Sequence, residues 1–357
     1  MQMIIGLIAF FFMLSAIVVI HELGHFLVAK HFGVYCHEFS IGMGPVLYQH
    51  QGKETMFSIR AIPFGGYVMM AGEEDGSQEE DTEWLQNVPS EKRLNHKKTW
   101  QQICVMVAGV CMNIILAWAL FVGLAMAKGY EILPSQPIVA QMEENGFMSQ
   151  AGLQVGDEIL EIHASKESLE PKTNDEVVEF IQYHHDDVTL KVQRENDIQM
   201  IGPVTFPYNE ELGGYLPGYK VQGNFRYTKW YEAFRIGSQE LVANTTMIFR
   251  SLANLFSGVG LENLSGPVGI YQVTAKTAQM GFDAYLSLFA MISLNIGIFN
   301  LIPIPALDGG RILILGFERL FRRKINTKLV EKIITVSFIL LIGLFIFATY
   351  NDIVRLF

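Results

Sequence analysis

The sequence has few charged residues, few cysteines and no excess of positive charge. Only 17% of its 357 residues are charged and 50% are hydrophobic, whereas about a quarter of an average soluble domain is charged. The three cysteines, Cys36, Cys104 and Cys111, are too few for a disulfide framework and lack the spacing of a zinc ribbon. A net charge of −10 argues against a general nucleic-acid binder, which needs a basic surface. The low share of charged residues, together with the high share of hydrophobic ones, indicates a membrane protein.

The negative charge is concentrated in one part of the chain. Residues 128–229 contain 17 Asp or Glu against 8 Lys or Arg, which accounts for nine of the ten net negative charges. The rest of the chain is nearly neutral and mostly apolar. The sequence therefore predicts one membrane-embedded body and one small soluble domain.

Four uncharged apolar runs have roughly the length of a membrane helix, which needs about 20 residues to cross about 30 Å of hydrocarbon. They cover residues 3–20, 103–127, 284–304 and 333–350. Basic residues flank them, before the second run and between the third and fourth: Lys92, Arg93, Lys97, Lys98, Arg319, Arg322, Arg323, Lys324, Lys328 and Lys332. Basic loops stay cytoplasmic, so we expect both termini and the acidic segment to lie outside.

His21, Glu22 and His25 form an HExxH motif at the end of the first run. Residues four apart share one face of a helix, so both imidazoles can bind one Zn²⁺. Glu22 can take a proton from the attacking water. Such polar residues are costly at the end of a membrane helix unless they have partners, which favours a metal site over a chance match. His21 lies about 27 Å along a helix that starts at Met3, near the cytoplasmic side.

Asp308 is the candidate third ligand, because a catalytic zinc takes three protein ligands and keeps one position open. It follows Pro303 and Pro305, which end the third apolar helix. The broken backbone needs a protein-lined or water-filled setting, since lipid cannot satisfy it. Asp308 is expected at the same depth as the HExxH motif. The alternative is an ordinary Asp-Gly-Gly turn at a helix end.

The two motifs, HExxH and NLIPIPALDGG at residues 300–310, together resemble the site-2 protease family of intramembrane zinc metalloproteases. FGGYV (64–68) and LSGPVGI (264–270) resemble its bacterial RseP/RasP-like branch, which has one PDZ domain. The resemblance covers essentially the whole chain. It implies that His21, His25 and Asp308 bind Zn²⁺, that Glu22 is the general base, and that Asn300 contacts the substrate backbone or oxyanion.

The resemblance also implies substrate contacts by Pro303, Pro305, Gly66, Tyr67 and Val68. Residues 54–62 alternate loosely, which predicts a strand between glycine turns. A hairpin with a free edge there either captures an unwound substrate as an added strand or merely covers the metal site; the resemblance favours capture. Asn113 and Asn295 are interpreted mainly as helix–helix contacts.

The acidic segment contains AGLQVGDEILEI at residues 151–162, which resembles the signature of a PDZ domain. Strands are expected at 137–142 and 187–194, with a helix at 174–184 capped by Asn174. PDZ domains bind extended peptides, but a gate that excludes intact ectodomains is an equal alternative. Residues 227–256 have helical apolar spacing, which fits either an interfacial helix or one packed on this domain.

We therefore expect an α-helical polytopic membrane protein with four transmembrane helices, a membrane-associated β-hairpin on the cytoplasmic side and an inserted extracytoplasmic α+β PDZ-like domain. The expected segments are 1–33 (first helix), 34–100 (hairpin and loop), 101–127 (second helix), 128–205 (PDZ-like), 206–282 (linker and amphipathic helix), 283–317 (third helix) and 318–357 (basic loop and fourth helix).

The function that the resemblance implies is intramembrane zinc endopeptidase activity in the bacterial cell membrane. Its substrates would be transmembrane segments already cut outside by a site-1 type protease, such as those of anti-sigma factors, and signal-peptide remnants. A membrane zinc transporter is one alternative, although it needs ligands at successive depths. A catalytically silent PDZ scaffold is the other, although it predicts a degraded metal motif.

Overall fold

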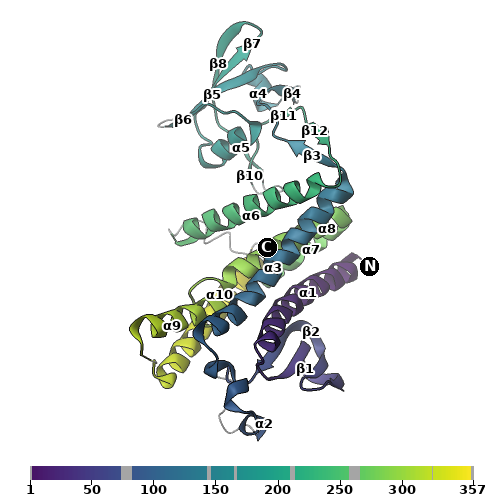
Figure 1. Cartoon of the computed structure of the whole chain (residues 1–357). Helices are drawn as coiled ribbons and strands as arrows, with labels where there is room; N and C mark the ends of the chain where they lie inside the picture. The colour runs from purple at the N-terminus through teal and green to yellow at the C-terminus, as the bar shows by residue number, and fades with distance from the viewer. Residues whose placement is uncertain are drawn as a thin grey trace. The chain divides into compact units, whose positions relative to one another are not determined.

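The computed structural model describes residues 2–73, 83–142, 146–164, 167–209, 214–256, 266–323 and 325–354. The chain divides into unit 1, Met1–Ala127 with Tyr231–Phe357, and unit 2, Lys128–Trp230. Figure 1 shows that unit 1 is mostly helical, while unit 2 contains short strands and two short helices.

Unit 1 is built from long helices and one pair of long strands. Its principal elements are α1 (Gln2–His31), β1 (Cys36–Gln51), β2 (Met56–Met70), α2 (Glu83–Gln86), α3 (Thr99–Lys128), α6 (Glu232–Phe256), α7 (Pro267–Met280), α8 (Phe282–Asn300), α9 (Asp308–Phe321) and α10 (Thr327–Val354).

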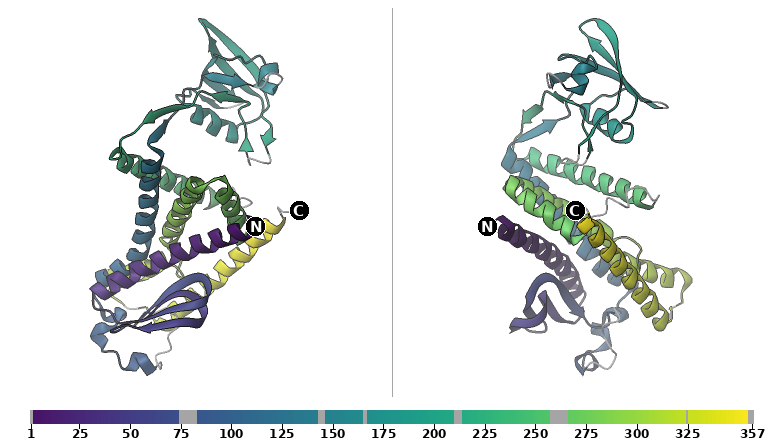
Figure 2. Two further views of the ribbon diagram at one scale, coloured as in Figure 1. Left: turned by 90° about the vertical axis from the view of Figure 1, so that its right-hand side faces the viewer. Right: turned by 180° about the vertical axis from the view of Figure 1, so that it is seen from behind.

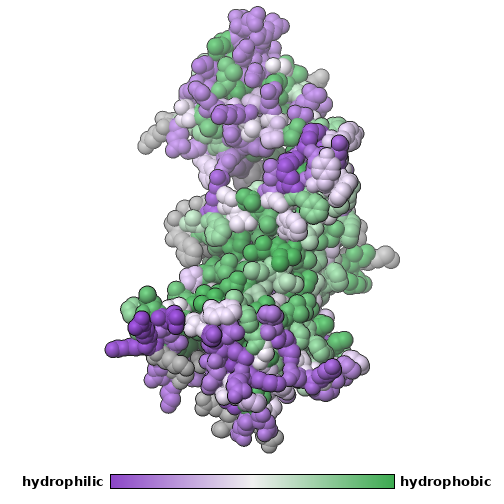
Figure 3. All heavy atoms as spheres, in the orientation of Figure 1, coloured by the Kyte–Doolittle hydropathy of each residue, from purple (hydrophilic) through white to green (hydrophobic). Residues whose placement is uncertain are grey.

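Four of these helices are long and apolar enough to cross a membrane: Met3–His31, Thr99–Lys128, Phe282–Asn300 and Lys328–Val354. Among the described residues, the prediction of four helices with the length and composition of membrane spans is thereby confirmed. Large apolar side chains remain exposed along them, including Phe12, Ile115 and Leu340, and Figure 3 shows hydrophobic residues gathered over the helices of unit 1. Such an extended apolar surface is unfavourable in water and suits contact with lipid.

The first helix ends in a well-defined cap. Gly33 has a φ of +68°, which a residue without a side chain adopts readily. Its N–H donates to Lys30 O at 3.0 Å, and Val34 N–H donates to Ala29 O at 2.9 Å. This pair of hydrogen bonds is a Schellman motif, which satisfies carbonyls that the helix end leaves free. It turns the chain directly into β1.

Strands β1 and β2 form a strongly bent sheet. Residues 38–41 of β1 have neighbours on both sides, because they pair with residues 66–69 and also with residues 56–59 of β2. The order of segments across the sheet is therefore 46–51, 56–60, 36–41 and 66–70. Segment 66–70 lies at an edge, and no further strand pairs with it among the described residues.

The apolar face of this sheet packs on α1. Phe26 of α1 makes edge-to-face contacts with Phe39 and Phe57 at centroid distances of 5.4 and 5.9 Å. Val68 and Met70 are buried in the same cluster. The views in Figure 2 agree with these contacts and show the sheet beside α1. The edge segment is thus held against the helix that carries HExxH.

The polar face contains a buried carboxylate, Glu38. Its oxygens accept hydrogen bonds from Ser58, from Arg60 at 2.7 Å and from Tyr67 at 2.8 Å. Burial alone would raise the pKa of Glu38, but these three donors outweigh it and lower the pKa below its ordinary value. The charged carboxylate therefore ties three segments of the sheet together, including the edge segment.

The third membrane helix ends earlier than the apolar run suggested. α8 stops at Asn300, three residues before Pro303, and α9 starts as a separate helix at Asp308. The backbone between them is satisfied by short turns, such as Leu301 N–H to Ile298 O at 3.0 Å and Leu307 N–H to Ile304 O at 2.8 Å. Local hydrogen bonding thus permits the break that the prolines require.

The glycines of the DGG sequence are required by close packing. A Cβ on Gly309 would lie 2.3 Å from Leu301 O, and one on Gly310 would lie 2.2 Å from Ile304 O. No side chain fits at such distances. The first turn of α9 is therefore fixed against the break, and Asp308 is fixed with it.

The glycine of the Ser-Gly-Pro-Val-Gly stretch at 265–269 also has a packing role. Pro267 opens α7, and Asp352 near the end of α10 accepts a hydrogen bond from Gly269 N–H at 2.7 Å. A Cβ on Gly266 would lie 2.8 Å from Asp352 Oδ2. Leu264 and Ser265 of the same motif lie outside the described residues.

Unit 2 has a four-stranded sheet in the order β6-β5-β7-β8, and two smaller strand pairs, β3 with β12 and β4 with β11. The bounds are β3 (Tyr130–Leu133), β4 (Val139–Met142), α4 (Phe147–Gln150), β5 (Glu158–Ala164), β6 (Glu167–Leu169), α5 (Asn174–Tyr183), β7 (Val188–Arg194), β8 (Asp197–Val204), β11 (Tyr219–Val221) and β12 (Asn224–Tyr227); β9 (Tyr208–Asn209) and β10 (Gly214–Tyr215) form one more pair.

The core of unit 2 lies between the sheet and α5, with Ile162, Val177 and Leu190 fully buried. Asp157 of the Gly-Asp dipeptide is also fully buried. Its charge is compensated by Arg194, which donates to both of its oxygens at 2.8 and 2.7 Å. The predicted cap of α5 is wrong: the helix is capped by Thr173, whose side chain accepts from Glu176 N–H.

Candidate active site

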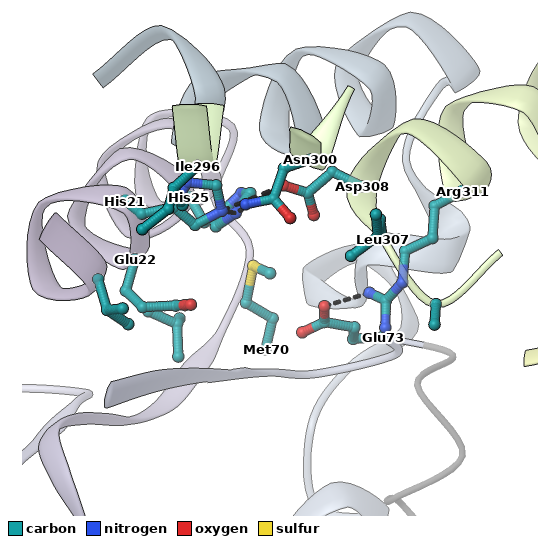
Figure 4. A pocket seen from close by; sticks show the side chains of 13 residues that line it. His21, Glu22, His25, Met70, Glu73, Ile296, Asn300, Leu307, Asp308 and Arg311 are labelled. Carbon is teal, nitrogen blue, oxygen red and sulfur yellow. Dashed lines mark hydrogen bonds and ion pairs between the residues drawn. The ribbon is translucent and has the colours of Figure 1, made fainter. Parts of the chain in front are cut away.

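Residues from three separate stretches line one pocket of about 280 Å³ in unit 1. Figure 4 shows the two histidines of α1 facing Asp308 of α9. The lining residues are Val18, His21, Glu22, His25, Val68, Met70, Glu73, Ile296, Asn300, Ala306, Leu307, Asp308 and Arg311. The pocket thus joins the HExxH helix, the sheet edge and the broken third helix.

Three potential ligand atoms converge in this pocket. His21 Nε2 lies 3.1 Å from His25 Nε2, and Asp308 Oδ2 lies 3.2 and 3.5 Å from these nitrogens. A tetrahedral zinc with bonds of about 2.0–2.1 Å separates its ligand atoms by about 3.3 Å. Within the described part of the chain, this buried Asp308 oxygen makes no hydrogen bond of good geometry. These residues therefore fit a zinc ion.

The ring of His25 is set for metal binding by its other nitrogen. Nδ1 lies 2.8 Å from the carbonyl oxygen of Val105 on α3. A carbonyl only accepts, so Nδ1 carries the proton and Nε2 keeps its lone pair. Such a contact fixes both the tautomer and the orientation of a ligating histidine.

Asn113 of α3 has the same relation to His21, and the sequence interpretation missed it. Its side-chain nitrogen is placed 3.3 Å from His21 Nδ1, while its Oδ1 is buried without a hydrogen-bond partner among the described residues. The two ends of an amide are interchangeable by rotation. With Oδ1 turned toward the ring it accepts from Nδ1–H, which leaves His21 Nε2 free for a metal. A lone asparagine in an apolar run gives no signal that its partner is a histidine 92 residues away.

Helices α1 and α3 touch at glycines beside the candidate metal-ligand atoms. A Cβ on Gly109 would lie 2.4 Å from His25 Nε2 and 2.8 Å from His21 Cε1. A Cβ on Gly24, within HExxH, would lie 2.4 Å from Ala108 O. Backbone approach at both glycines therefore leaves room for the two imidazoles and for nothing larger.

Two further charged groups that line the pocket form an ion pair with each other. Glu73 follows β2 and forms an ion pair with Arg311, one turn after Asp308. Figure 4 shows this pair near Leu307 and shows the Glu22 carboxyl separate from it. Glu22 and Asn300 both line the pocket.

The structure brings together six of the predicted site residues: His21, Glu22, His25, Asn300, Asp308 and Val68 all line the pocket. Four do not. Pro303 and Pro305 lie in the break between α8 and α9, and Gly66 and Tyr67 lie on β2 outside the lining.

Comparison with known proteins decides the family. The model of peptidase family M50 matches residues 9–344. The chain belongs to peptidase family M50. This family comprises the site-2 proteases, so the resemblance drawn from HExxH and LDGG is confirmed.

Its relatives cover the chain from end to end. A Clostridium perfringens protein whose name reads "Putative zinc metalloprotease" is 35% identical over 99% of both chains. A Staphylococcus aureus (strain N315) protein with a name of the same form is 29% identical over 100% of both. "Regulator of sigma-W protease RasP" of Bacillus subtilis is 29% identical over 98% of both. The M50 member described here is an integral membrane zinc metalloprotease of the site-2 type.

Proposed function

We propose that this protein cleaves transmembrane segments of single-span membrane proteins at a zinc ion held by His21, His25 and Asp308. The observation that carries the proposal is the convergence of three candidate ligand atoms, 3.1–3.5 Å apart, from the apolar helix α1 and the start of α9. Among the described residues, these three form the one group of His, Cys, Asp or Glu that could hold a metal. A tetrahedral zinc ion has four coordination positions, so three protein ligands leave one position open for water or substrate.

The hydrolysis is assigned to the residues around this group. When bound, zinc supplies a Lewis acid that polarises the scissile carbonyl and makes water a better nucleophile. Glu22 takes a proton from the water while the water oxygen bonds to the carbonyl carbon. Glu22 then gives that proton to the leaving amide nitrogen as the C–N bond breaks. Asn300 donates its amide N–H toward the oxygen on which negative charge develops.

The sheet edge is proposed to hold the substrate. Peptide bonds in a transmembrane helix are hydrogen-bonded internally, so the segment must unwind before it is cut. Segment 66–70 offers an edge whose Val68 and Met70 line the pocket, and an unwound segment can add to it as a strand. In this arrangement Gly66 and Tyr67 contact the substrate backbone, and Pro303 and Pro305 shape the opposite wall.

The orientation follows from the basic residues. With the segments containing Lys97 and Arg323 in the cytoplasm, both termini and unit 2 lie outside, and the hairpin and metal site lie toward the cytoplasm. Unit 2 acts as a PDZ-like domain that either binds a peptide or excludes substrates with intact ectodomains. Cutting then follows removal of the ectodomain by another protease. The RasP relative's name suggests anti-sigma factors as one substrate class.

Reconstituted cleavage tests this proposal. The purified protein, loaded with zinc, is mixed with a panel of single-span substrates with and without ectodomains, and the cut is located by mass spectrometry. We expect cleavage inside the membrane segment, faster for the shortened substrates. If the protein binds zinc but cuts no member of the panel, the proposal fails; zinc uptake into sealed vesicles would then favour a transporter, and its absence a scaffold.

The ligand assignment predicts the effect of Asp308→Asn. The amide keeps the shape of the carboxylate but loses the charge that pairs with zinc. Because it changes a direct ligand, we expect zinc affinity to fall by more than the 10–100-fold typical of changes to supporting residues. Zinc content is measured by competition with a chelator. Asp283→Asn, in the first turn of α8 and outside the pocket, is the matched control; equal zinc affinity in both variants would contradict the assignment.

The role of the sheet edge predicts the effect of Glu38→Gln. An amide cannot accept from Ser58, Arg60 and Tyr67 together, so the edge segment loses its anchor while the metal site is untouched. We expect KM to rise about 10-fold, which corresponds to ~1.4 kcal/mol, with zinc content unchanged. Glu54→Gln is the control: that carboxylate is 42% exposed and pairs with Lys30 and Lys92, and exposed pairs contribute only about 0–1 kcal/mol. A change confined to kcat would argue against substrate binding by the edge.

A further inference from the structure

Helix α9 has an apolar face that is exposed among the described residues of its own unit. Leu313, Phe317, Leu320 and Phe321, called here the outer face of α9, are between 49% and 76% exposed. The rings of Phe317 and Phe321 contact each other in a tilted arrangement, with their centroids 4.3 Å apart and their planes at 38°. On the opposite side of the helix, Ile314 and Leu315 are half-buried and line a pocket of about 270 Å³ together with residues of α3 and α10. The helix is therefore amphipathic, and its outer face is exposed within the described part of the chain.

The end of this helix carries free positive charge. Arg319, Arg322 and Arg323 are exposed, and no ion pair or hydrogen bond of their side chains occurs within the described part of the chain. The nearby acidic residue, Glu318, points to the inner side and accepts from Ile325 N–H at 2.8 Å. The helix thus combines an outer face of four large apolar side chains with a basic end whose arginines have no acidic partner among the described residues.

The length of α9 excludes a transmembrane position. Its 14 residues extend for about 21 Å, less than the about 30 Å of a hydrocarbon core. A short helix with an apolar face and basic residues at its border suits the plane of a membrane interface, where apolar side chains enter the acyl region and arginines contact anionic headgroups.

The same helix begins at the metal site. Asp308 is its first residue, and Gly309 and Gly310 pack against the break so closely that the first turn has no freedom. A force on the far end of a rigid helix of four turns is transmitted to its first residue. A contact that holds the outer face of α9 in place therefore also helps to fix the position of Asp308.

We propose that the outer face of α9 docks onto a leaflet that contains anionic phospholipid, and that this contact holds Asp308 in its ligating position. The proposal rests on the assignment of Asp308 as a zinc ligand. Within the described residues no acidic side chain pairs with these arginines, and their positive charge selects an anionic lipid surface as the occupant. A soluble protein partner is the competing occupant.

Lipid binding by the full-length chain tests the docking. The delipidated protein is titrated with phosphatidylglycerol or phosphatidylcholine and bound lipid is counted by native mass spectrometry. We compare the wild type with Arg319→Gln/Arg322→Gln/Arg323→Gln, and use Arg319→Lys/Arg322→Lys/Arg323→Lys as the control that keeps the charge. Each basic residue near an anionic surface contributes about fivefold to affinity, so the Gln variant should bind phosphatidylglycerol about 100-fold more weakly, while the Lys variant should resemble the wild type.

Zinc retention and cleavage in nanodiscs test the coupling. We expect the wild type and the Lys variant to retain zinc against a chelator longer, and to cut faster, when phosphatidylglycerol is present, and the Gln variant to lose this response. The proposal is overturned if the Gln variant keeps its phosphatidylglycerol preference, as a soluble partner on this face would predict, or if zinc retention is the same in both lipids. Absence of cleavage in every lipid would instead count against the peptidase proposal, since lipid binding and zinc retention are measured independently.

Discussion

Glu22→Gln is expected to abolish cleavage while the protein still binds zinc. Glu22 lines the pocket beside the two histidines but is not one of the three converging ligand residues. The amide has the size of the carboxylate and leaves the helix and the metal-binding atoms in place. It cannot accept the proton of the attacking water. A positioned base contributes about 10²–10⁴-fold, so kcat should fall by about 1,000-fold or more.

Two further carboxylates make this result interpretable. Glu91→Gln changes an exposed residue outside the pocket, and its activity should equal that of the wild type. Glu73→Gln changes the second glutamate that lines the pocket, which is engaged with Arg311. The assignment of the base is wrong if Glu73→Gln is inactive and Glu22→Gln remains active. Cut substrate and bound zinc are measured on the same preparations.

The four long apolar helices and the candidate metal residues could be predicted because each depends on local sequence. An uncharged run of about 20 residues has few alternatives to a membrane helix, and the i, i+4 spacing of His21 and His25 places them on one helix face. The position of Asp308 could be predicted for a related reason. Pro303 and Pro305 mark the break in the third helix, and the depth of that break follows from the length of the run before it.

The bent sheet could not be predicted, because its pairing is not local. Residues 54–62 indicated one strand and Gly65 a turn, whereas β2 continues through Gly65 to Met70. That strand pairs with β1 on two sides only because both strands bend. Glu38 looks like one more surface carboxylate until Ser58, Arg60 and Tyr67 are brought around it.

The prolines predicted the break in the third membrane segment, but the start of a separate helix at Asp308 was beyond the sequence pattern. Apolar residues continue after Asp308, and nothing in their periodicity separates α9 from a continuing transmembrane helix. The separation depends on Gly309 and Gly310, whose missing side chains let α9 start against the carbonyls of Leu301 and Ile304. The sequence alone does not show which atoms pack against a glycine, so it does not show that a larger residue would clash there.

Gly109→Ala is the strongest test of that kind of packing at the metal site. The new Cβ would lie 2.4 Å from His25 Nε2, inside van der Waals contact. The imidazole cannot turn away without losing the hydrogen bond of its Nδ1 to Val105 O at 2.8 Å. Either α3 moves back or His25 does, and the three ligand atoms no longer converge. Misplacement of a reacting group by about 1 Å costs about 100-fold, so we expect at least this loss in kcat/KM, together with reduced zinc content.

Gly123→Ala supplies the matched control on the same helix. No heavy atom lies within 4 Å of a Cβ built on Gly123, and replacing glycine by alanine inside a helix stabilises it by about 0.5–1 kcal/mol. Both variants therefore gain the same helix propensity, and only Gly109→Ala meets an obstacle. Gly123→Ala should keep full zinc content and activity. Equal behaviour of the two variants would mean that α3 does not press on the histidines, and that the sensitivity of this site to its second helix has been overestimated.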